Sequence, residues 1–128
     1  MSDTTTAISG IHTIVIPVTD HERAISFYTE TLGFEVRRDA SYGAGNRWVE
    51  VAAPGAQTTI ALANRRDGQI VGEETGIRLA TGDANAAHED LKARGVEVDD
   101  ILNFGPSVPP MFYMRDPEGN RLVVVEVA

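Results

Sequence analysis

The chain contains no cysteine, which excludes several kinds of site at once. Without a thiol there is no disulfide, no thiolate-bound zinc, no iron–sulfur cluster and no cysteine nucleophile. Positive charge is also scarce, because 11 Lys and Arg stand against 19 Asp and Glu and the net charge is −8. Nucleic acids and anionic membrane surfaces are bound through an excess of positive charge, so this composition argues against both partners.

Long apolar runs are missing as well. No stretch approaches the ~18 apolar residues that a membrane helix needs. The first residues, MSDTTTAISG, lack the basic segment and the apolar run of a secretory signal. We therefore expect a cytoplasmic protein with a loose polar tail over residues 1–9.

The common motifs of phosphate binding and nucleophilic catalysis are absent too. There is no G-x-G-x-x-G, no P-loop and no G-x-S-x-G elbow, and the GAG at residues 43–45 has the composition of a turn. An enzyme built on this chain would need other groups, so the sequence favours binding over catalysis.

The apolar pattern of the 128 residues predicts a β-α-β-β-β module followed by a second copy of it. In the first copy, strands are expected at 11–18, 34–38, 47–52 and 58–63, with residues 41–46 as a turn. The helix before Gly33 has two possible caps, Thr19 in a capping box with Glu22, or Asp20.

The second copy repeats this order. Strands are expected at 76–81, 96–98, 111–115 and 122–127, and a helix capped by Asp83 ends at Gly95. Ile14, Ile16 and Asp20 fall on Ile77, Leu79 and Asp83 with one offset, and GFEV falls on GVEV. The sequence predicts modules at 10–63 and 75–128, joined by a linker at 64–74, in one domain of the α+β class.

Two segments, VTDHERAISFYTETLGFEV and DPEGNRLVVVE, resemble the vicinal oxygen chelate superfamily of glyoxalases, bleomycin-resistance proteins and extradiol dioxygenases. The resemblance covers residues 10–127. It implies paired βαβββ modules whose curved mixed sheets enclose a ligand cavity.

Enzymes of that superfamily hold one divalent metal through His and Glu side chains on inward-facing strand positions. The resemblance places those positions at Thr13, Ala61, Gly76 and Val123, none of which offers an imidazole or a carboxylate. It therefore implies a member without metal or other cofactor.

One alternative metal-binding set remains open in the sequence. His12, Glu50 and Glu126 could bind a metal only if their strands slipped by one residue, because His12 is expected on the opposite pleat from Thr13. His21 and His88 are expected to be solvated.

Eight residues are candidates for the cavity lining. One of them, Arg78, would be stabilised by an anion if it were buried. Arg78 is a possible anchor for a carboxylate or enolate, although a salt bridge to a strand neighbour such as Glu50 is an equal alternative. Trp48 and Tyr113 offer flat surface for an aromatic ligand. The full set is Thr13, Val15, Trp48, Ala61, Arg78, Tyr113, Arg121 and Val123.

The resemblance implies the function of the bleomycin-resistance branch, whose homodimers sequester an organic small molecule in a cavity between subunits. The alternative is a lyase, isomerase or dioxygenase acting on a small carbonyl or aromatic substrate. Such an enzyme would use either a displaced metal site or polar groups such as Arg78 and Tyr113. A purely structural module with a filled barrel is the third reading.

Overall fold

The computed structural model describes residues 6–127 and contains two four-stranded sheets. The first sheet is built from β1 (Thr13–Val18), β2 (Glu35–Tyr42), β3 (Asn46–Ala52) and β4 (Thr59–Asn64), with α1 (His21–Ser26) and the π-helical turn η1 (Phe27–Thr31) between its first two strands. The second sheet is built from β5 (Glu74–Thr81), β6 (Glu97–Val98), β7 (Met111–Arg115) and β8 (Arg121–Glu126), with α2 (Ala84–Ala93) after β5.

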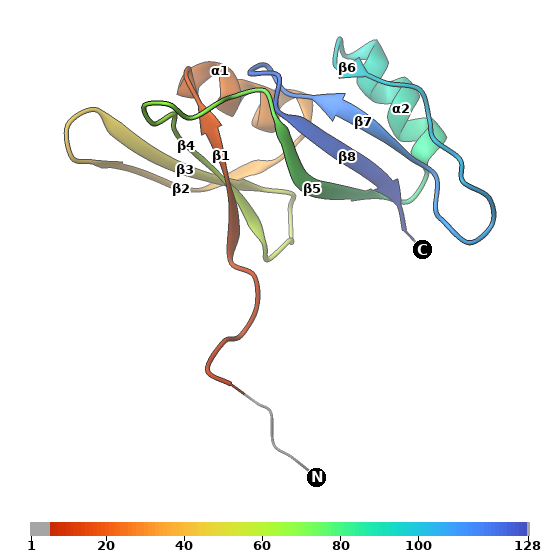
Figure 1. Ribbon diagram of the computed structural model, residues 1–128, viewed down its shortest axis with the longest axis horizontal. Helices are drawn as coiled ribbons and strands as arrows, with labels where there is room; N and C mark the ends of the chain where they lie inside the picture. Colours follow the sequence, from red (N-terminus) through yellow and green to blue (C-terminus); the bar gives the residue numbers. More distant parts are fainter. Residues whose placement is uncertain (1–5, 128) are drawn as a thin grey trace.

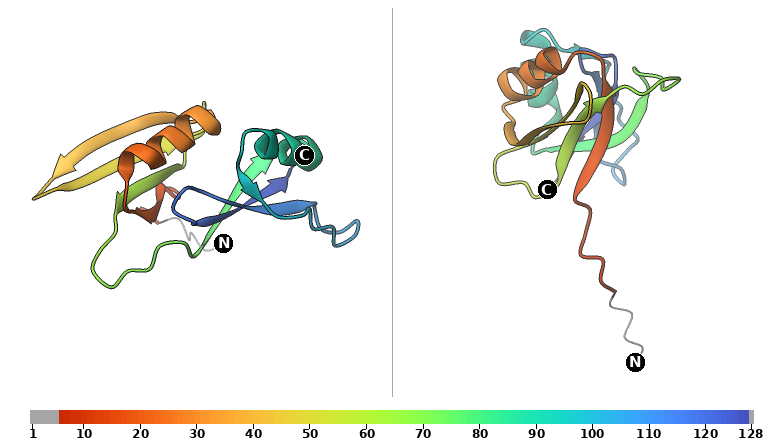
Figure 2. Two further views of the ribbon diagram at one scale, coloured as in Figure 1. Left: turned by 90° about the horizontal axis from the view of Figure 1, so that it is seen from above. Right: turned by 90° about the vertical axis from the view of Figure 1, so that its left-hand side faces the viewer.

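Both sheets have the same topology. The strand orders are β1-β4-β3-β2 and β5-β8-β7-β6, in which β1 pairs parallel with β4 and β5 pairs parallel with β8. The remaining pairs are antiparallel. This confirms the predicted α+β class with two βαβββ modules. The sheets lie side by side, each with its helix, and residues 6–12 extend away from them (Figures 1 and 2).

Each helix covers one face of its sheet because the strand residues alternate. Ile16 and Val18 point to the α1 side and are each 1% exposed, in a core that includes Tyr28. In the second sheet, Ile77 of β5 and Met114 of β7 point to the α2 side and belong to the same buried core. In both modules the helix therefore covers the face that carries these buried apolar side chains.

The start of α1 differs from the preferred prediction. Asp20 is the N-cap, with its Oδ1 accepting a hydrogen bond from the backbone N of Arg23 at 3.1 Å. The capping box of Thr19 and Glu22 is wrong, because the hydroxyl of Thr19 donates instead to Glu118, 99 residues away. No sequence pattern near the helix predicts Glu118 as the partner of Thr19.

The β2–β3 hairpin is longer than expected. β2 continues to Tyr42, and the turn is confined to residues 43–45 instead of 41–46. Most of β2 is exposed on both faces, so its sequence, EVRRDASY, carries no apolar alternation that would mark it as a strand.

The turn between β7 and β8, residues 116–120, joins the two sheets, and we call it the connecting turn. Asp116 accepts a hydrogen bond from the hydroxyl of Tyr28 at 3.0 Å, and the side-chain amide of Asn120 donates to the carbonyl of Pro17 at 3.1 Å. The carboxylate of Glu118 accepts from the backbone N of Asp20 at 2.9 Å. The orientation of one sheet relative to the other therefore depends on this turn.

None of the helices formed by residues 6–127 is long and apolar enough to cross a membrane.

Candidate functional site

The face of the first sheet opposite α1, which we call the first face, carries half of the predicted lining residues. The register aligns Val15 with Ala61 and Ala61 with Glu50, while Trp48 pairs with Ala63 in the next row. Thr13, two residues before Val15, lies on the same face. Val15 is half-exposed, whereas Ala61 is fully buried and forms the floor of this face.

Glu50 is the residue of the first face that the sequence did not identify as part of the lining. Its side chain is buried, with the residue only 5% exposed. The indole Nε1 of Trp48 donates to its Oε2 at 2.8 Å, while His12 Nε2 lies 3.6 Å from Oε1 and Arg38 Nε lies 3.9 Å from Oε2. The only sequence signal was an acidic residue inside an otherwise apolar strand.

These neighbours set the protonation of Glu50. The hydrogen bond from Trp48 lowers the pKa of the Glu50 carboxyl and outweighs the opposing effect of burial, and the neighbouring His12 and Arg38 lower it further. Glu50 is therefore a stable anion and a weak base at neutral pH.

Two threonines continue this polar cluster. Thr59 Oγ1 lies 2.7 Å from Thr13 Oγ1 and 3.4 Å from Glu50 Oε1, so its single proton has two acceptors. The Thr13 hydroxyl itself donates to the carbonyl of Thr59 at 3.1 Å. The hydroxyl at this metal position of the superfamily is thus already engaged with its neighbour.

The predicted placement of His12 is wrong. The residue precedes β1, so strand alternation does not fix its direction, and its ring approaches Glu50 on the first face without any slip of the strand. Glu126 lies elsewhere, since its Oε1 accepts from the backbone N of Ala84 at the start of α2. The alternative metal-binding trio is therefore not assembled.

The other two histidines are not fully solvated, contrary to expectation. His21 Nε2 lies 3.1 Å from the carbonyl of Leu62, and His88 Nε2 lies 2.9 Å from the carbonyl of Asp99. Both rings are partly covered by the body of the protein.

The second sheet presents the other half of the predicted lining residues on its face opposite α2, the second face. Arg78, Val123 and Tyr113 form one row across three strands, and Arg121 lies two residues before Val123 on β8. The Arg121 guanidinium carbon lies 5.5 Å from the centre of the Tyr113 ring. Val123, 1% exposed, is the buried floor of this row.

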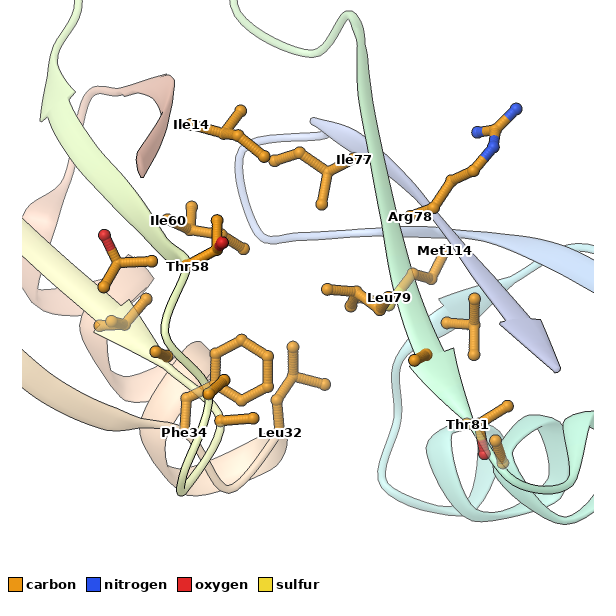
Figure 3. Close-up of a pocket in the computed structure, with 18 of the residues that line it drawn as sticks. Ile14, Leu32, Phe34, Thr58, Ile60, Ile77, Arg78, Leu79, Thr81 and Met114 are labelled. Carbon is orange, nitrogen blue, oxygen red and sulfur yellow. The ribbon is translucent and has the colours of Figure 1, made fainter. Parts of the chain in front are cut away.

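Arg78 does not make the suggested salt bridge with Glu50. Glu50 belongs to the first sheet and has its own partners there, and within residues 6–127 neither Arg78 nor Arg121 forms an ion pair. Arg78 is exposed, and Figure 3 shows its guanidinium pointing away from the apolar side chains on the other side of β5.

Two concave regions of residues 6–127 each contain predicted lining residues from a single face. A hollow of about 630 Å³ over the first face is lined by Val15, Pro17, Tyr42, Trp48 and Ala63, among others. A cleft of about 440 Å³ separates the sheets, and its apolar walls come from the helix-covered sides, including Ile14, Phe34, Ile60, Ile77 and Leu79 (Figure 3).

The residues present do not fit the metal ion that the superfamily's enzymes hold. Ala61 and Val123 have no donor atoms, and Gly76 has a φ of +77°, in a stretch where the pairing of β5 with β8 shifts register. A histidine there would be strained, because L side chains rarely adopt that conformation. Within residues 6–127 no group of three or more His, Cys, Asp or Glu converges.

Replacing Glu50 with glutamine should make the stability of the protein less sensitive to acid. Because the folded-state pKa of Glu50 is below its unfolded value, its ionisation stabilises the fold above about pH 4.3. That contribution is lost as the pH falls through the lowered pKa. Urea unfolding between neutral pH and pH 3 should show a smaller acid loss for Glu50→Gln than for the wild type.

Asp116 is expected to behave in the opposite way, because burial raises the pKa of its carboxyl. Its ionisation therefore lowers the stability of the fold as the pH rises, whereas the ionisation of Glu50 increases it. A Glu50→Gln variant that loses stability in acid as steeply as the wild type would contradict the assignment.

Comparison with known proteins agrees with this architecture. The model of the family described as "Glyoxalase/Bleomycin resistance protein/Dioxygenase superfamily" matches residues 10–124. A Bacillus subtilis (strain 168) protein described as "Uncharacterized protein YetH" is 31% identical over 125 residues, covering 93% of this chain and 99% of its own.

Two solved structures are similar along nearly the whole chain. TnmS3, described as an antibiotic binding protein from Streptomyces sp. CB03234, is 33% identical with a TM-score of 0.84, covering 97% of this chain and 100% of its own. A superfamily member from Sphaerobacter thermophilus DSM 20745 is 37% identical with a TM-score of 0.87, covering 95% and 100%.

Proposed function

Since the chain belongs to the glyoxalase/bleomycin resistance protein/dioxygenase superfamily, we propose that it binds and sequesters an organic small molecule without a metal ion and without altering it. The observation that carries this proposal is the character of the two faces. The superfamily's metal positions carry Thr13, Ala61, Gly76 and Val123, while aromatic and charged side chains surround them. Such faces can hold and orient a ligand but supply no Lewis acid.

The similarity to TnmS3 supports the same function, because that protein is described as binding an antibiotic. The acidic composition and the described helices offer no support for a nucleic-acid or membrane partner.

We further propose that two copies form the complete site. The hollow over the first face contains Val15 and Trp48 and none of the predicted lining residues of the second face, so a homodimer that sets the first face of one copy against the second face of the other would enclose a cavity. A ligand cavity usually covers most of the surface of its ligand, which neither open face achieves alone.

A metal-free lyase or isomerase is the second candidate, favoured by the proximity of His12 and Glu50 at 3.6 Å. The lowered pKa of Glu50 counts against it, since a general base works best with a pKa near the working pH. Loss of substrate in the presence of the protein would distinguish this candidate from sequestration.

A thermal-shift screen with antibiotics, aromatic acids and thiol conjugates tests the proposal. A true ligand at 100 times its Kd should raise Tm by on the order of 10 °C. We expect the same shift after dialysis against EDTA and after addition of Zn²⁺, Ni²⁺ or Mn²⁺, and mass spectrometry should recover the compound unchanged. A shift that requires metal, or a compound that is consumed, would overturn the proposal.

A further inference from the structure

Most ion pairs of this acidic protein lie away from the second face. Five arginines have a carboxylate within 4.0 Å, and they are Arg37, Arg38, Arg47, Arg94 and Arg115. Arg78 and Arg121 have none within residues 6–127, although the net charge is −8 and acidic side chains outnumber basic ones. Arg115 stands beside Arg121 on the same face and has Glu97 and Asp99 as partners, whereas Arg78 and Arg121 have no carboxylate within 4.0 Å in the described chain.

The acidic residues nearest in the fold are engaged elsewhere. Glu74 stands opposite Arg121 in the register of β5 and β8, yet its carboxylate accepts a hydrogen bond from the backbone N of Gly76 at 3.2 Å. Glu50 on the first face is already surrounded by Trp48, His12 and Arg38. Within residues 6–127 neither carboxylate lies within 4.0 Å of the Arg78 or Arg121 guanidinium.

A guanidinium that loses water in a closed site needs an anion, because an uncompensated charge away from water is costly. Arg121 is already half-buried and lies over the Tyr113 ring, which holds it in place. Arg78 is two strands from Tyr113 in the same row, with the buried Val123 between them. This row combines cations, an aromatic ring and an apolar floor.

We propose that the sequestered molecule is a planar organic acid whose carboxylate is bound by Arg78 and Arg121. The inference rests on the proposed binding function and names the ligand class. A guanidinium matches the plane of a carboxylate and donates two parallel hydrogen bonds to it. The ring of the ligand would lie on Tyr113 and, across the dimer, on Trp48, whose indole is held by Glu50. At physiological salt, charges more than about 8 Å away are largely screened, so the repulsion from distant acidic groups is weak. The nearby arginines therefore determine that an anionic ligand is preferred.

Three ring compounds of similar shape but different charge test whether the site selects its ligand by charge. Benzoate, benzamide and benzamidine carry negative, zero and positive charge on the same ring, and Trp48 is the single tryptophan of the chain and a fluorescent reporter on the first face. We expect benzoate to bind about tenfold tighter than benzamide and benzamidine to bind weakest. Added salt should weaken benzoate and leave benzamide unchanged.

Substitutions locate the effect. Arg78→Gln and Arg121→Gln should each weaken benzoate about tenfold without changing benzamide. Arg23→Gln is the matched control, because it makes the same change in net charge on the exposed side of α1 and should leave benzoate binding unchanged. Arg78→Lys keeps the charge without the planar fork and should bind benzoate with intermediate affinity.

The results with these probes distinguish failure of the organic-acid class from failure of the proposed sequestration. Equal binding of benzoate and benzamide, or equal weakening by Arg23→Gln, would overturn the organic-acid class while sequestration of another compound stands. No response to any of the probes at millimolar concentration would also overturn the class. Failure of every compound in the broad screen would overturn the proposed function itself.

Discussion

Replacing Asp116 with alanine should lower the free energy of unfolding by about 3–5 kcal/mol. The carboxylate is 5% exposed and accepts hydrogen bonds from the Tyr28 hydroxyl, from the backbone N of Glu118 and Asn120, and from the Asn120 amide. Alanine would leave the Tyr28 hydroxyl and the backbone N of Glu118 and Asn120 without this acceptor, and Tyr28 is fully buried. Donors stranded away from water account for most of the expected loss.

Two comparison variants should lose less stability than Asp116→Ala in urea unfolding at pH 7. Tyr28→Phe removes one donor and leaves the carboxylate, so it should cost only about 1 kcal/mol. Asp67→Ala removes an exposed carboxylate in the segment between the sheets and should change stability by less than about 0.5 kcal/mol. If Asp116→Ala resembled Asp67→Ala, the connecting turn would not hold the sheets together.

The second large effect is the rescue of binding in a mixed dimer. Val15→Glu places a negative charge on the first face, and Arg78→Glu reverses the charge of the second face, so each homodimer should lose benzoate binding. Both residues are exposed in the single chain, which favours folding of the variants. A heterodimer of the two variants contains one site in which both faces are wild type. It should therefore recover about half the wild-type capacity.

Two purification tags isolate the heterodimer after co-expression, and equilibrium dialysis with benzoate counts its sites. Light scattering should give about twice the 13.8 kDa mass of one chain for the wild type and both variants. A site formed within one chain would leave the heterodimer as inactive as its parents. A dimer without rescue would therefore contradict the proposed pairing of faces while leaving sequestration open.

The fold was predictable where one side of a strand is buried. Ile14, Ile16 and Val18 were placed on one face of their strand by alternation, and the matching pattern from Ile77 placed a strand in the second module. β2 offered no such contrast, and its full length depends on pairing with β3. Thr19 and Glu118 show the same limit at long range, since their hydrogen bond joins residues 99 positions apart.

The candidate site was predictable in its faces but not in its polar contacts. The family resemblance supplied Ala61 and Val123, alternation supplied Val15 and Arg78, and the register places Val15 beside Ala61 and Arg78 beside Val123. His12 lies just outside β1, where alternation gives no direction, and its approach to Glu50 was therefore missed. The environment of Glu50 comes from β1, β2, β3 and β4 together, which no single segment encodes.

The backbone of Gly76 bears on how such a protein changes over generations. Its left-handed φ of +77° occupies the place where the superfamily's enzymes carry a ligand to their metal. A substitution to histidine would strain β5 before it gained a metal, and the other three positions would still lack donors. A metal site at these positions would therefore need several substitutions together, since a single change would either strain β5 or add one isolated ligand.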